Sequence, residues 1–303
     1  GGILVTRTDE RYIEVLSRHM ASLLPLFDDR SITDIERNPN GRIFLHHIDG
    51  SVTERPDLSI EDRSIIAVGT LLAARTHNDI DENKPSVDAV WPGKVHFRIH
   101  INIAGNRPFL VMRRPSTLVF PLSHYVEIGT CTEEQAGLLR HLINNRRNII
   151  ISGETGSGKT TLASTLLSSI PEDDRLFIVE DTEELNTTGL SNFVSRTTNT
   201  SYTARMAIKD ALRCRPDRIV VGEVRDGAAL DLLEAWNTGH PGGLATIHAN
   251  SPSAVKLRLK ALIQQVSMSP QEDLIDETVD AVVQLTLCDD GVRRITEIKQ
   301  FKE

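Results

Sequence analysis

Eight consecutive residues carry the groups needed to bind a phosphate chain. They are Gly153-Glu154-Thr155-Gly156-Ser157-Gly158-Lys159-Thr160, and they match the pattern G-x-x-x-x-G-K-[ST] at every defined position. Three glycines let the backbone bend so that successive N–H groups point into one cavity. Lys159 brings a positive charge to the β- and γ-phosphates, Thr160 places a hydroxyl for Mg²⁺, and Thr161 is the next nucleotide-binding position. We therefore predict that the chain binds a nucleoside triphosphate.

A second candidate group is the carboxyl of Glu223, which follows the apolar run 218–222. In an open α/β sheet, ligands bind at the carboxyl ends of the strands, and a buried acid there is costly unless it is paired or functional. An Asp often follows such a run directly, whereas here Gly222 comes first and Glu223 second. We therefore predict that Glu223 orients the water that attacks the γ-phosphate, rather than ligating the metal.

An acidic cluster, Glu180-Asp181-Thr182-Glu183-Glu184, ends another apolar run. We predict that Glu180, Asp181 and Glu183 complete the metal shell around Thr160, with Glu183 as the rival to Glu223 for the role of general base. The alternative is that the cluster is a solvated loop.

Histidines and arginines supply further candidates. His240 lies in a glycine-rich turn and His248 ends the apolar strand that follows it. A histidine near a γ-phosphate can donate a hydrogen bond, although His248 could equally be a hydrogen-bonded core residue. Guanidinium groups stabilise the charge that develops in phosphoryl transfer, often from another domain or subunit. The arginines considered are Arg98, Arg113, Arg114, Arg213 and Arg215, and for any one of them spacing alone favours a surface charge.

The elements that must position these groups fall into two patterns. Residues 1–113 mix two amphipathic helical stretches with short alternating strands, which predicts an α+β domain. Residues 114–132 contain prolines and a glycine without a clear period and are predicted to be a linker. Residues 133–303 alternate strands with helices and end in a hairpin, which predicts an α/β domain with a parallel sheet. The phosphate-binding residues lie between the strand 147–152 and a helix that begins near Thr161.

Composition limits the remaining possibilities. The 303 residues carry a net charge of −8, and residues 1–113 hold 14 basic against 16 acidic side chains. Bulk electrostatics therefore do not favour nucleic acid. Three widely separated cysteines indicate a reducing compartment and no zinc module. We expect no membrane span and no signal peptide.

Taken together, these motifs resemble the secretion ATPase superfamily, the hexameric motors of type II and type IV secretion and of type IV pili. The resemblance is dense over residues 130–270 and includes Leu212-Arg213-Cys214-Arg215-Pro216-Asp217-Arg218 and Gly222-Glu223-Val224-Arg225-Asp226. The stretch Ala235-Trp236-Asn237-Thr238-Gly239-His240-Pro241-Gly242-Gly243 is similar to the type IV secretion branch, and within it to conjugal-transfer ATPases of the TrbB kind.

The resemblance implies a RecA-like C-terminal domain and a PAS-like N-terminal domain, stacked as the two layers of a ring. It implies that Arg98 and Arg113 reach the phosphates from the N-terminal domain and that Arg213 and Arg215 act across a subunit boundary. The family's acidic box falls on residues 180–183, its catalytic glutamate on Glu223, and its histidine box on His240 and His248.

The function expected from the resemblance is a cytoplasmic ATPase that uses Mg²⁺ and powers pilus assembly or substrate transport as a homo-hexamer. Other secretion-machine subunits are its expected partners, with peripheral association at the inner face of the bacterial inner membrane. Two alternatives stay open: a nucleic-acid translocase, and a ring scaffold that switches with ATP but does no motor work. The acidic balance and the lack of a basic, aromatic stripe count against direct nucleic-acid binding.

Overall fold

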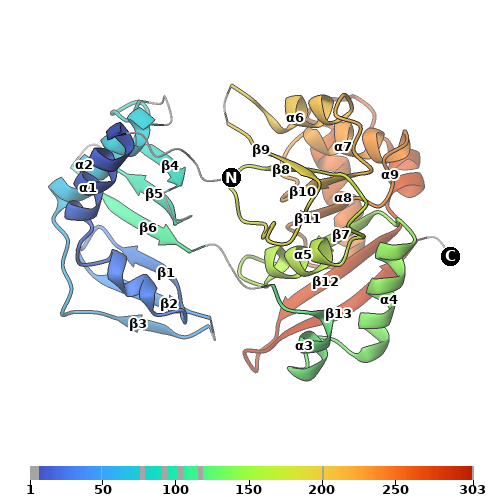
Figure 1. Cartoon of the computed structure of the whole chain (residues 1–303), viewed down its shortest axis with the longest axis horizontal. Coiled ribbons are helices and arrows are strands. Elements are labelled where there is room, and N and C mark those ends of the chain that lie inside the picture. The colour runs from blue at the N-terminus through green and yellow to red at the C-terminus, as the bar shows by residue number, and fades with distance from the viewer. Residues whose placement is uncertain are drawn as a thin grey trace. The chain divides into compact units, whose positions relative to one another are not determined.

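The computed structural model describes residues 7–48, 50–75, 79–90, 95–101, 105–114, 119–199 and 201–301, with side chains from residue 12 onward. The chain divides into two compact units, residues 1–115 and 116–303 (Figure 1). Part of the predicted linker, residues 115–118, lies outside the described residues, as do residues 102 and 103, the end of the strand that alternating apolar residues predict over 95–103.

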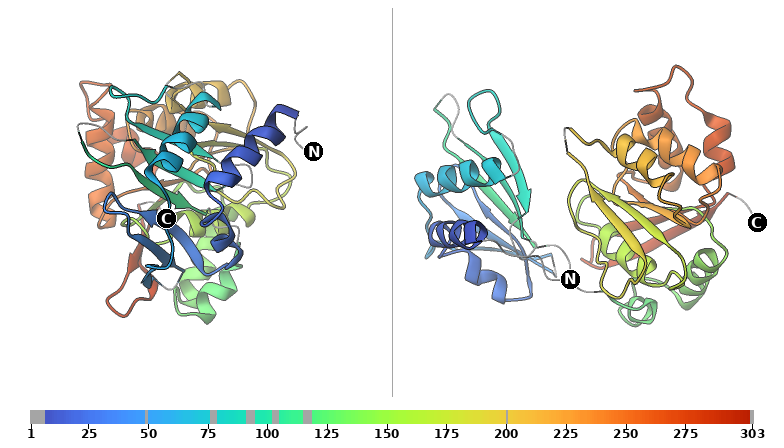
Figure 2. Two further views of the ribbon diagram at one scale, coloured as in Figure 1. Left: turned by 90° about the vertical axis from the view of Figure 1, so that its left-hand side faces the viewer. Right: turned by 45° about the horizontal axis from the view of Figure 1, so that its top comes forward.

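The first unit is built on an antiparallel sheet with the strand order β3-β2-β1-β6-β5-β4. Its strands are β1 (Ile32–Arg37), β2 (Ile43–His47), β3 (Val52–Glu54), β4 (Ser86–Val90), β5 (His96–His100) and β6 (Phe109–Arg113). Helices α1 (Arg7–His19) and α2 (Asp62–Arg75) pack on one face of this sheet, and a short 3₁₀ helix, η1 (Leu24–Asp28), joins α1 to β1 (Figure 2). Alternation along β5 buries Phe97 and Ile99 in the core and leaves Arg98 on the opposite face.

The second unit contains a sheet with the strand order β13-β12-β7-β11-β10-β8-β9. All its neighbouring strands run parallel except β12 and β13, which form the C-terminal hairpin. The strands are β7 (Ile149–Ser152), β8 (Leu176–Glu180), β9 (Phe193–Thr197), β10 (Arg218–Val221), β11 (Leu244–Ile247), β12 (Ala281–Leu287) and β13 (Arg293–Gln300). An α/β fold with a parallel-containing sheet is thus confirmed.

Helices cover both faces of the second sheet (Figure 2). One apolar cluster packs α3 (Leu122–Glu127), α4 (Glu133–Asn144) and α5 (Lys159–Ser168) against the sheet. The other packs α6 (Ala204–Ala211), α7 (Ala228–Asn237), α8 (Pro252–Ile263) and α9 (Glu272–Thr278) on the opposite face. Strands buried on both faces carry continuous apolar runs, which is why β7, β8 and β10 are recognisable in the sequence.

The structure adds elements that the sequence pattern did not indicate. Helix α3 lies inside the range 114–132, and its Leu122 and Tyr125 are buried in the second unit. Strand β9 is a half-exposed edge strand, and helix α9 is short. Within the described part of the chain, no helix is long and apolar enough to cross a membrane.

Candidate active site

The phosphate-binding loop lies between β7, which is fully buried, and the first turn of α5. Gly156 and Gly158 have φ values of +77° and +95°, a region that side-chain-bearing residues rarely adopt. Glycine is needed at Gly153 for a different reason, because a Cβ there would lie 2.2 Å from the Leu285 carbonyl oxygen. The glycines of the motif therefore serve both the turn and a close approach of the neighbouring strand β12.

Lys159 begins α5 and folds back onto the loop. Its Nζ donates to the carbonyl oxygens of Gly153 at 3.0 Å and Glu154 at 2.7 Å, and lies 3.4 Å from His248 Nδ1. Burial lowers the pKa of Lys159, and the charge of Glu223 opposes that shift. Nearby, Ser157 Oγ is buried, and among the described residues it has no hydrogen-bond partner. The Lys159 ammonium group, held by loop carbonyls, and the Ser157 hydroxyl, which lacks a hydrogen-bond partner among the described residues, are both donors suited to binding a phosphate chain.

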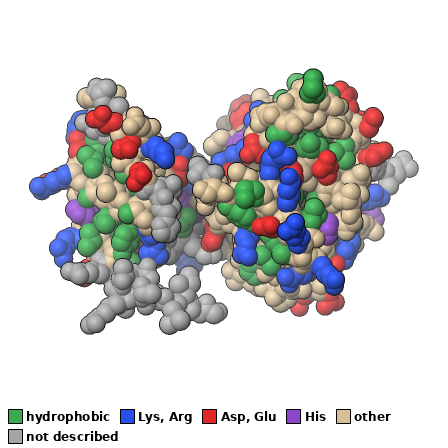
Figure 3. Space-filling view, turned by 90° about the horizontal axis from the view of Figure 1, so that it is seen from above, with side chains coloured by type: hydrophobic (Ala, Val, Ile, Leu, Met, Phe, Trp, Pro, Cys, Tyr) green, Lys and Arg blue, Asp and Glu red, His purple; other side chains and the backbone are tan. Residues whose placement is uncertain are grey.

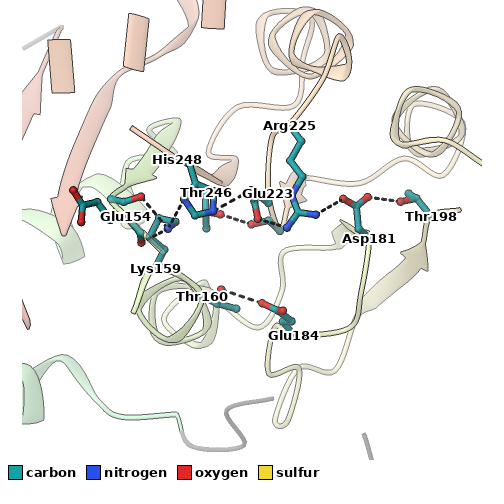
Figure 4. Close-up of polar contacts among 12 residues, drawn as sticks. Glu154, Lys159, Thr160, Asp181, Glu184, Thr198, Glu223, Arg225, Thr246 and His248 are labelled. Carbon is teal, nitrogen blue, oxygen red and sulfur yellow. Dashed lines mark hydrogen bonds and ion pairs between the residues drawn. The ribbon is translucent and has the colours of Figure 1, made fainter. Parts of the chain in front are cut away.

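Glu223 follows β10 and is held from two sides (Figure 4). Its Oε2 accepts from Arg225 Nη2 at 2.6 Å, and His248 Nε2 lies 3.3 Å from Oε1. Burial alone would raise the pKa of Glu223, but the hydrogen bond and charge of Arg225, with the charge of Lys159, lower it overall. The carboxyl is therefore ionised at neutral pH, and it is connected to Lys159 through His248, which contacts both residues.

His248 follows β11 and links Glu223 to Lys159. Its pKa is lowered first by burial and then by the charge of Lys159, so the ring is neutral at neutral pH. A carboxylate facing Nε2 and an ammonium facing Nδ1 assign the tautomer with hydrogen on Nε2. The sequence alone left open whether His248 is a core residue, and the structure places it with Lys159 and Glu223.

The buried carboxyl of Glu180 is turned toward its own loop. Glu180 Oε1 accepts from the backbone N–H groups of Glu184 at 2.9 Å and Leu185 at 2.8 Å. Burial raises its pKa to about 7, more than these two hydrogen bonds lower it. Its side chain lies over Gly222, where a Cβ would come within 2.9 Å of Glu180 Cγ. This packing is a physical reason for the glycine that separates β10 from Glu223.

Among the acidic residues of this loop, the structure brings Glu184 to Thr160. Thr160 Oγ1 donates to Glu184 Oε2 at 3.3 Å (Figure 4). Of the three predicted metal ligands, Glu180 is held by backbone N–H groups, Asp181 contacts Thr198 at 2.5 Å and Arg225 at 3.4 Å, and Glu183 is exposed. Glu184 belongs to the same acidic run, but no pattern in the sequence distinguishes it from its neighbours as the residue that faces Thr160.

Residues that could hold Mg²⁺ are therefore the Thr160 hydroxyl and the Glu184 carboxylate. Within the described ranges, no three His, Cys, Asp or Glu side chains gather as a metal-binding group. This sparse donor set fits Mg²⁺, which usually keeps several waters and binds through one or two protein oxygens plus substrate phosphates.

Three predicted residues lie at the amino ends of the strands, opposite the carboxyl ends where the phosphate-binding loop lies. His240 precedes β11, and its Nδ1 lies 2.7 Å from the Pro216 carbonyl oxygen. Arg213 and Arg215 lie between α6 and β10 and are exposed. Since the loop follows the carboxyl end of β7, the structure does not bring these three side chains to this chain's own loop.

The two arginines predicted from the first unit share the face of the sheet opposite its core. Arg98 Nη1 lies 3.6 Å from Asp88 Oδ1, and Arg113 Nε donates to Asp34 Oδ1 at 2.6 Å. Both guanidinium groups are more than half exposed, at 61% and 52%. Both guanidinium groups thus lie at the surface of the first unit, each beside a carboxylate.

Comparison with known proteins supplies an independent finding. Residues 32–302 match the family described as "Type II/IV secretion system protein". The "Probable conjugal transfer protein TrbB" of Sinorhizobium fredii is 37% identical over 302 residues, covering 97% of this chain and 92% of that protein. The VirB11 ATPase of the Brucella suis type IV secretion system, crystallised with sulphate, is 27% identical with a TM-score of 0.52, covering 94% of this chain and 97% of that chain. The ATPase DotB of Legionella pneumophila shares the fold, with 20% identity and a TM-score of 0.64 over 92% of this chain and 82% of that chain.

Proposed function

This chain belongs to the type II/IV secretion system protein family, as its motifs predicted, and on that premise we propose that it hydrolyses ATP as the hexameric motor of a type IV secretion or conjugation system. Its work is to power pilus assembly or substrate transport. The observation that carries the proposal is the contact series from the loop lysine through His248 to Glu223, set at the carboxyl ends of neighbouring parallel strands.

The chemistry follows from the charge of each group. The backbone N–H groups of the loop and Lys159 bind the β- and γ-phosphates, where Lys159 exchanges its contacts with loop carbonyls for phosphate oxygens. Glu223 is ionised and orients the attacking water, and neutral His248 holds Glu223 through its Nε2–H group. Thr160 and Glu184 would hold Mg²⁺, which neutralises charge on the phosphates when it is bound.

Arginines from elsewhere complete the proposed site. Arg98 and Arg113 of the first unit, together with Arg213 and Arg215 of a neighbouring subunit, supply positive charge to the phosphates. Arg213 and Arg215 are exposed and lie at the amino ends of the strands, away from the phosphate-binding loop of their own chain. This position supports action on the nucleotide of a neighbouring subunit.

The domain assignment extends the proposal. Residues 1–113 form a PAS-like domain and residues 133–303 a RecA-like domain; of the predicted linker 114–132, helix α3 packs into the core of the second unit and is assigned to the RecA-like domain. The non-sequential strand order of the second sheet, with the loop strand β7 in its interior between β12 and β11, supports the RecA-like assignment.

The proposed partners are identical subunits and other proteins of a secretion machine, at the cytoplasmic face of a bacterial inner membrane. Direct nucleic-acid binding is not part of the proposal. On the face of the second unit seen in Figure 3, basic side chains are interspersed with acidic ones, which supports that choice.

The first experiment is specific ATPase activity as a function of protein concentration, with Lys159→Ala as the inactive control. If neighbouring subunits complete each active site, turnover per chain rises steeply with concentration. Flat, high turnover at concentrations where only monomer is present would overturn the hexameric reading. Strong stimulation by DNA that disappears at high salt would point instead to a nucleic-acid translocase.

A cell-based assay separates a motor from a scaffold. Glu223→Gln should bind ATP but barely hydrolyse it, so cells that carry this variant should lose transport. Intact transport in those cells would contradict the motor role and favour a ring that only switches with nucleotide.

A further inference from the structure

The C-terminal hairpin β12–β13 lies directly against the phosphate-binding loop (Figure 1). Strand β12 runs parallel to β7, with Gln284 opposite Ser152, so the next residue of each strand lies where the loop begins. Ser152 Oγ donates to Gln284 Oε1 at 2.5 Å, and the Leu285 carbonyl occupies the space beside Gly153. The base of the loop is therefore anchored to a strand that arises more than a hundred residues later in the chain.

The far side of the loop is contacted by the other strand of the hairpin. Arg293, the first residue of β13, donates from Nε to the Gly156 carbonyl oxygen at 3.1 Å. Its Cδ lies 3.2 Å from the position that a Cβ on Gly158 would take. The Arg293 side chain thus lies beside Gly156 and Gly158, two of the three loop glycines that have positive φ.

We propose that Arg293 is a positioning residue that orders the phosphate-binding loop and thereby sets nucleotide affinity. This inference rests on the nucleotide site proposed above. Glycine loses more conformational freedom than any other residue when it is ordered, and this loop contains three glycines. The hydrogen bond from the Arg293 guanidinium to the Gly156 carbonyl restricts the loop before the nucleotide binds. The loop therefore loses less conformational entropy on binding.

Arg293 therefore affects nucleotide binding rather than bond cleavage. A tether on the backbone of Gly156 is present whether the loop holds ATP or the transition state, so it stabilises both alike. Loss of such uniform binding raises KM and leaves kcat nearly unchanged. Glu223 and His248 follow other strands, β10 and β11, and neither is among the loop contacts made by Arg293.

Arg294 offers a matched control on the same strand. It pairs with Asp290, with Nη2 2.7 Å from Oδ2 and Nη1 2.9 Å from Oδ1. Neighbouring residues of a strand point to opposite faces, so Arg294 points away from the side that contacts the loop. Arg293→Met and Arg294→Met remove the same positive charge from the hairpin, which cancels any long-range effect on an anionic ligand.

The test measures ATP binding by calorimetry and hydrolysis by steady-state kinetics on the full chain. Arg293→Met keeps an aliphatic side chain over Gly158 but removes the donor. We expect Kd and KM for ATP to rise about ten-fold with kcat within two-fold, the scale of one hydrogen bond from a charged group. Arg293→Lys should recover part of the affinity, and Arg294→Met should bind ATP within two-fold of the wild type.

Three results would overturn the inference: unchanged ATP affinity in Arg293→Met, an equal loss in Arg294→Met, or a fall in kcat as large as the fall in kcat/KM. Thermal unfolding of each variant separates a folding defect from a loop effect, and Arg293→Lys provides the test if the Met variant unfolds. Failure of the nucleotide site itself has a different signature. In that case the wild type would not bind ATP saturably, or Lys159→Ala would bind and hydrolyse it normally.

Discussion

Substituting Glu180 by glutamine tests whether its carboxyl is a buried anchor of the acidic loop or a metal ligand. Glu180 is 4% exposed, and its Oε1 accepts two backbone N–H groups, which an amide oxygen can also accept. The pKa of this carboxyl is raised from 4.5 to about 7 by burial. The shift makes the stability of the second unit depend on pH in a way that the amide variant does not share.

The sign follows from which state holds the proton. Well below pH 4.5 the carboxyl is protonated in both the folded and the unfolded chain. Between pH 4.5 and about 7 the unfolded chain has released the proton that the folded chain retains, so the free energy of unfolding falls as pH rises. At about 1.4 kcal/mol per pKa unit, the advantage of Glu180→Gln over the wild type should grow by about 2.5 kcal/mol between pH 5 and pH 8.

The assay is urea unfolding at several pH values, followed by the fluorescence of Trp236. The chain has two tryptophans, so a Trp91→Phe background leaves Trp236, which is buried in the second unit, as the sole reporter. Glu183→Gln is the matched control, because Glu183 belongs to the same loop but is exposed. A difference between Glu180→Gln and wild type that stays constant within about 0.5 kcal/mol across this range would refute the burial argument. A ten-fold higher Mg²⁺ requirement in Glu180→Gln would favour the metal-ligand role predicted from the sequence.

Four further substitutions test the site. Lys159→Ala should lower kcat/KM for ATP by about 100-fold or more, since it removes the charge that faces the phosphates, and normal hydrolysis would disprove the site. Glu223→Gln should lower kcat by about 10²- to 10⁴-fold with ATP binding intact, and a larger loss in Glu183→Gln would reassign the base. Glu184→Gln should raise the Mg²⁺ concentration for half-maximal activity about 10-fold or more, and Glu183→Gln should not. Because neutral His248 has a pKa below 6.5, its protonation should reduce kcat at acidic pH, and His248→Gln should lack that limb of the pH profile.

Much of the second unit could be predicted from sequence, because its decisive signals are local. The loop motif encodes the φ values that only glycine adopts readily, as Gly156 and Gly158 demonstrate. The apolar runs of β7, β8 and β10 reflect burial on both faces of the sheet. Strand β9 was missed because it is a half-exposed edge strand with little apolar signal. The position of β12 beside β7 depends on pairing between distant residues, which no local pattern encodes.

The structure brings together some of the predicted site residues and not others, and the differences have physical causes. Which carboxylate of an acidic loop faces Thr160 depends on how the loop is anchored, and Glu180 anchors it through the backbone N–H groups of Glu184 and Leu185. Such a loop has no side-chain period, so Glu183 and Glu184 could not be distinguished. For the histidines a usable signal existed: His240 precedes β11 and His248 follows it, and ligands bind where parallel strands end.

The pairing of β7 also determines when a nascent chain can complete its phosphate-binding loop. Both neighbours of β7 are synthesised much later, β11 at residues 244–247 and β12 at residues 281–287. At ribosomal speeds of about 5–20 residues per second, the motif waits on the order of ten seconds before β12 and Arg293 exist. Before β11 is synthesised β7 has two unpaired edges, and before β12 is synthesised it still has one, a state prone to non-native pairing. A chain that ends before residue 281 would keep the whole phosphate-binding motif but lack the strand that shapes it, so the unit becomes competent for nucleotide only after β12 and β13 have been synthesised.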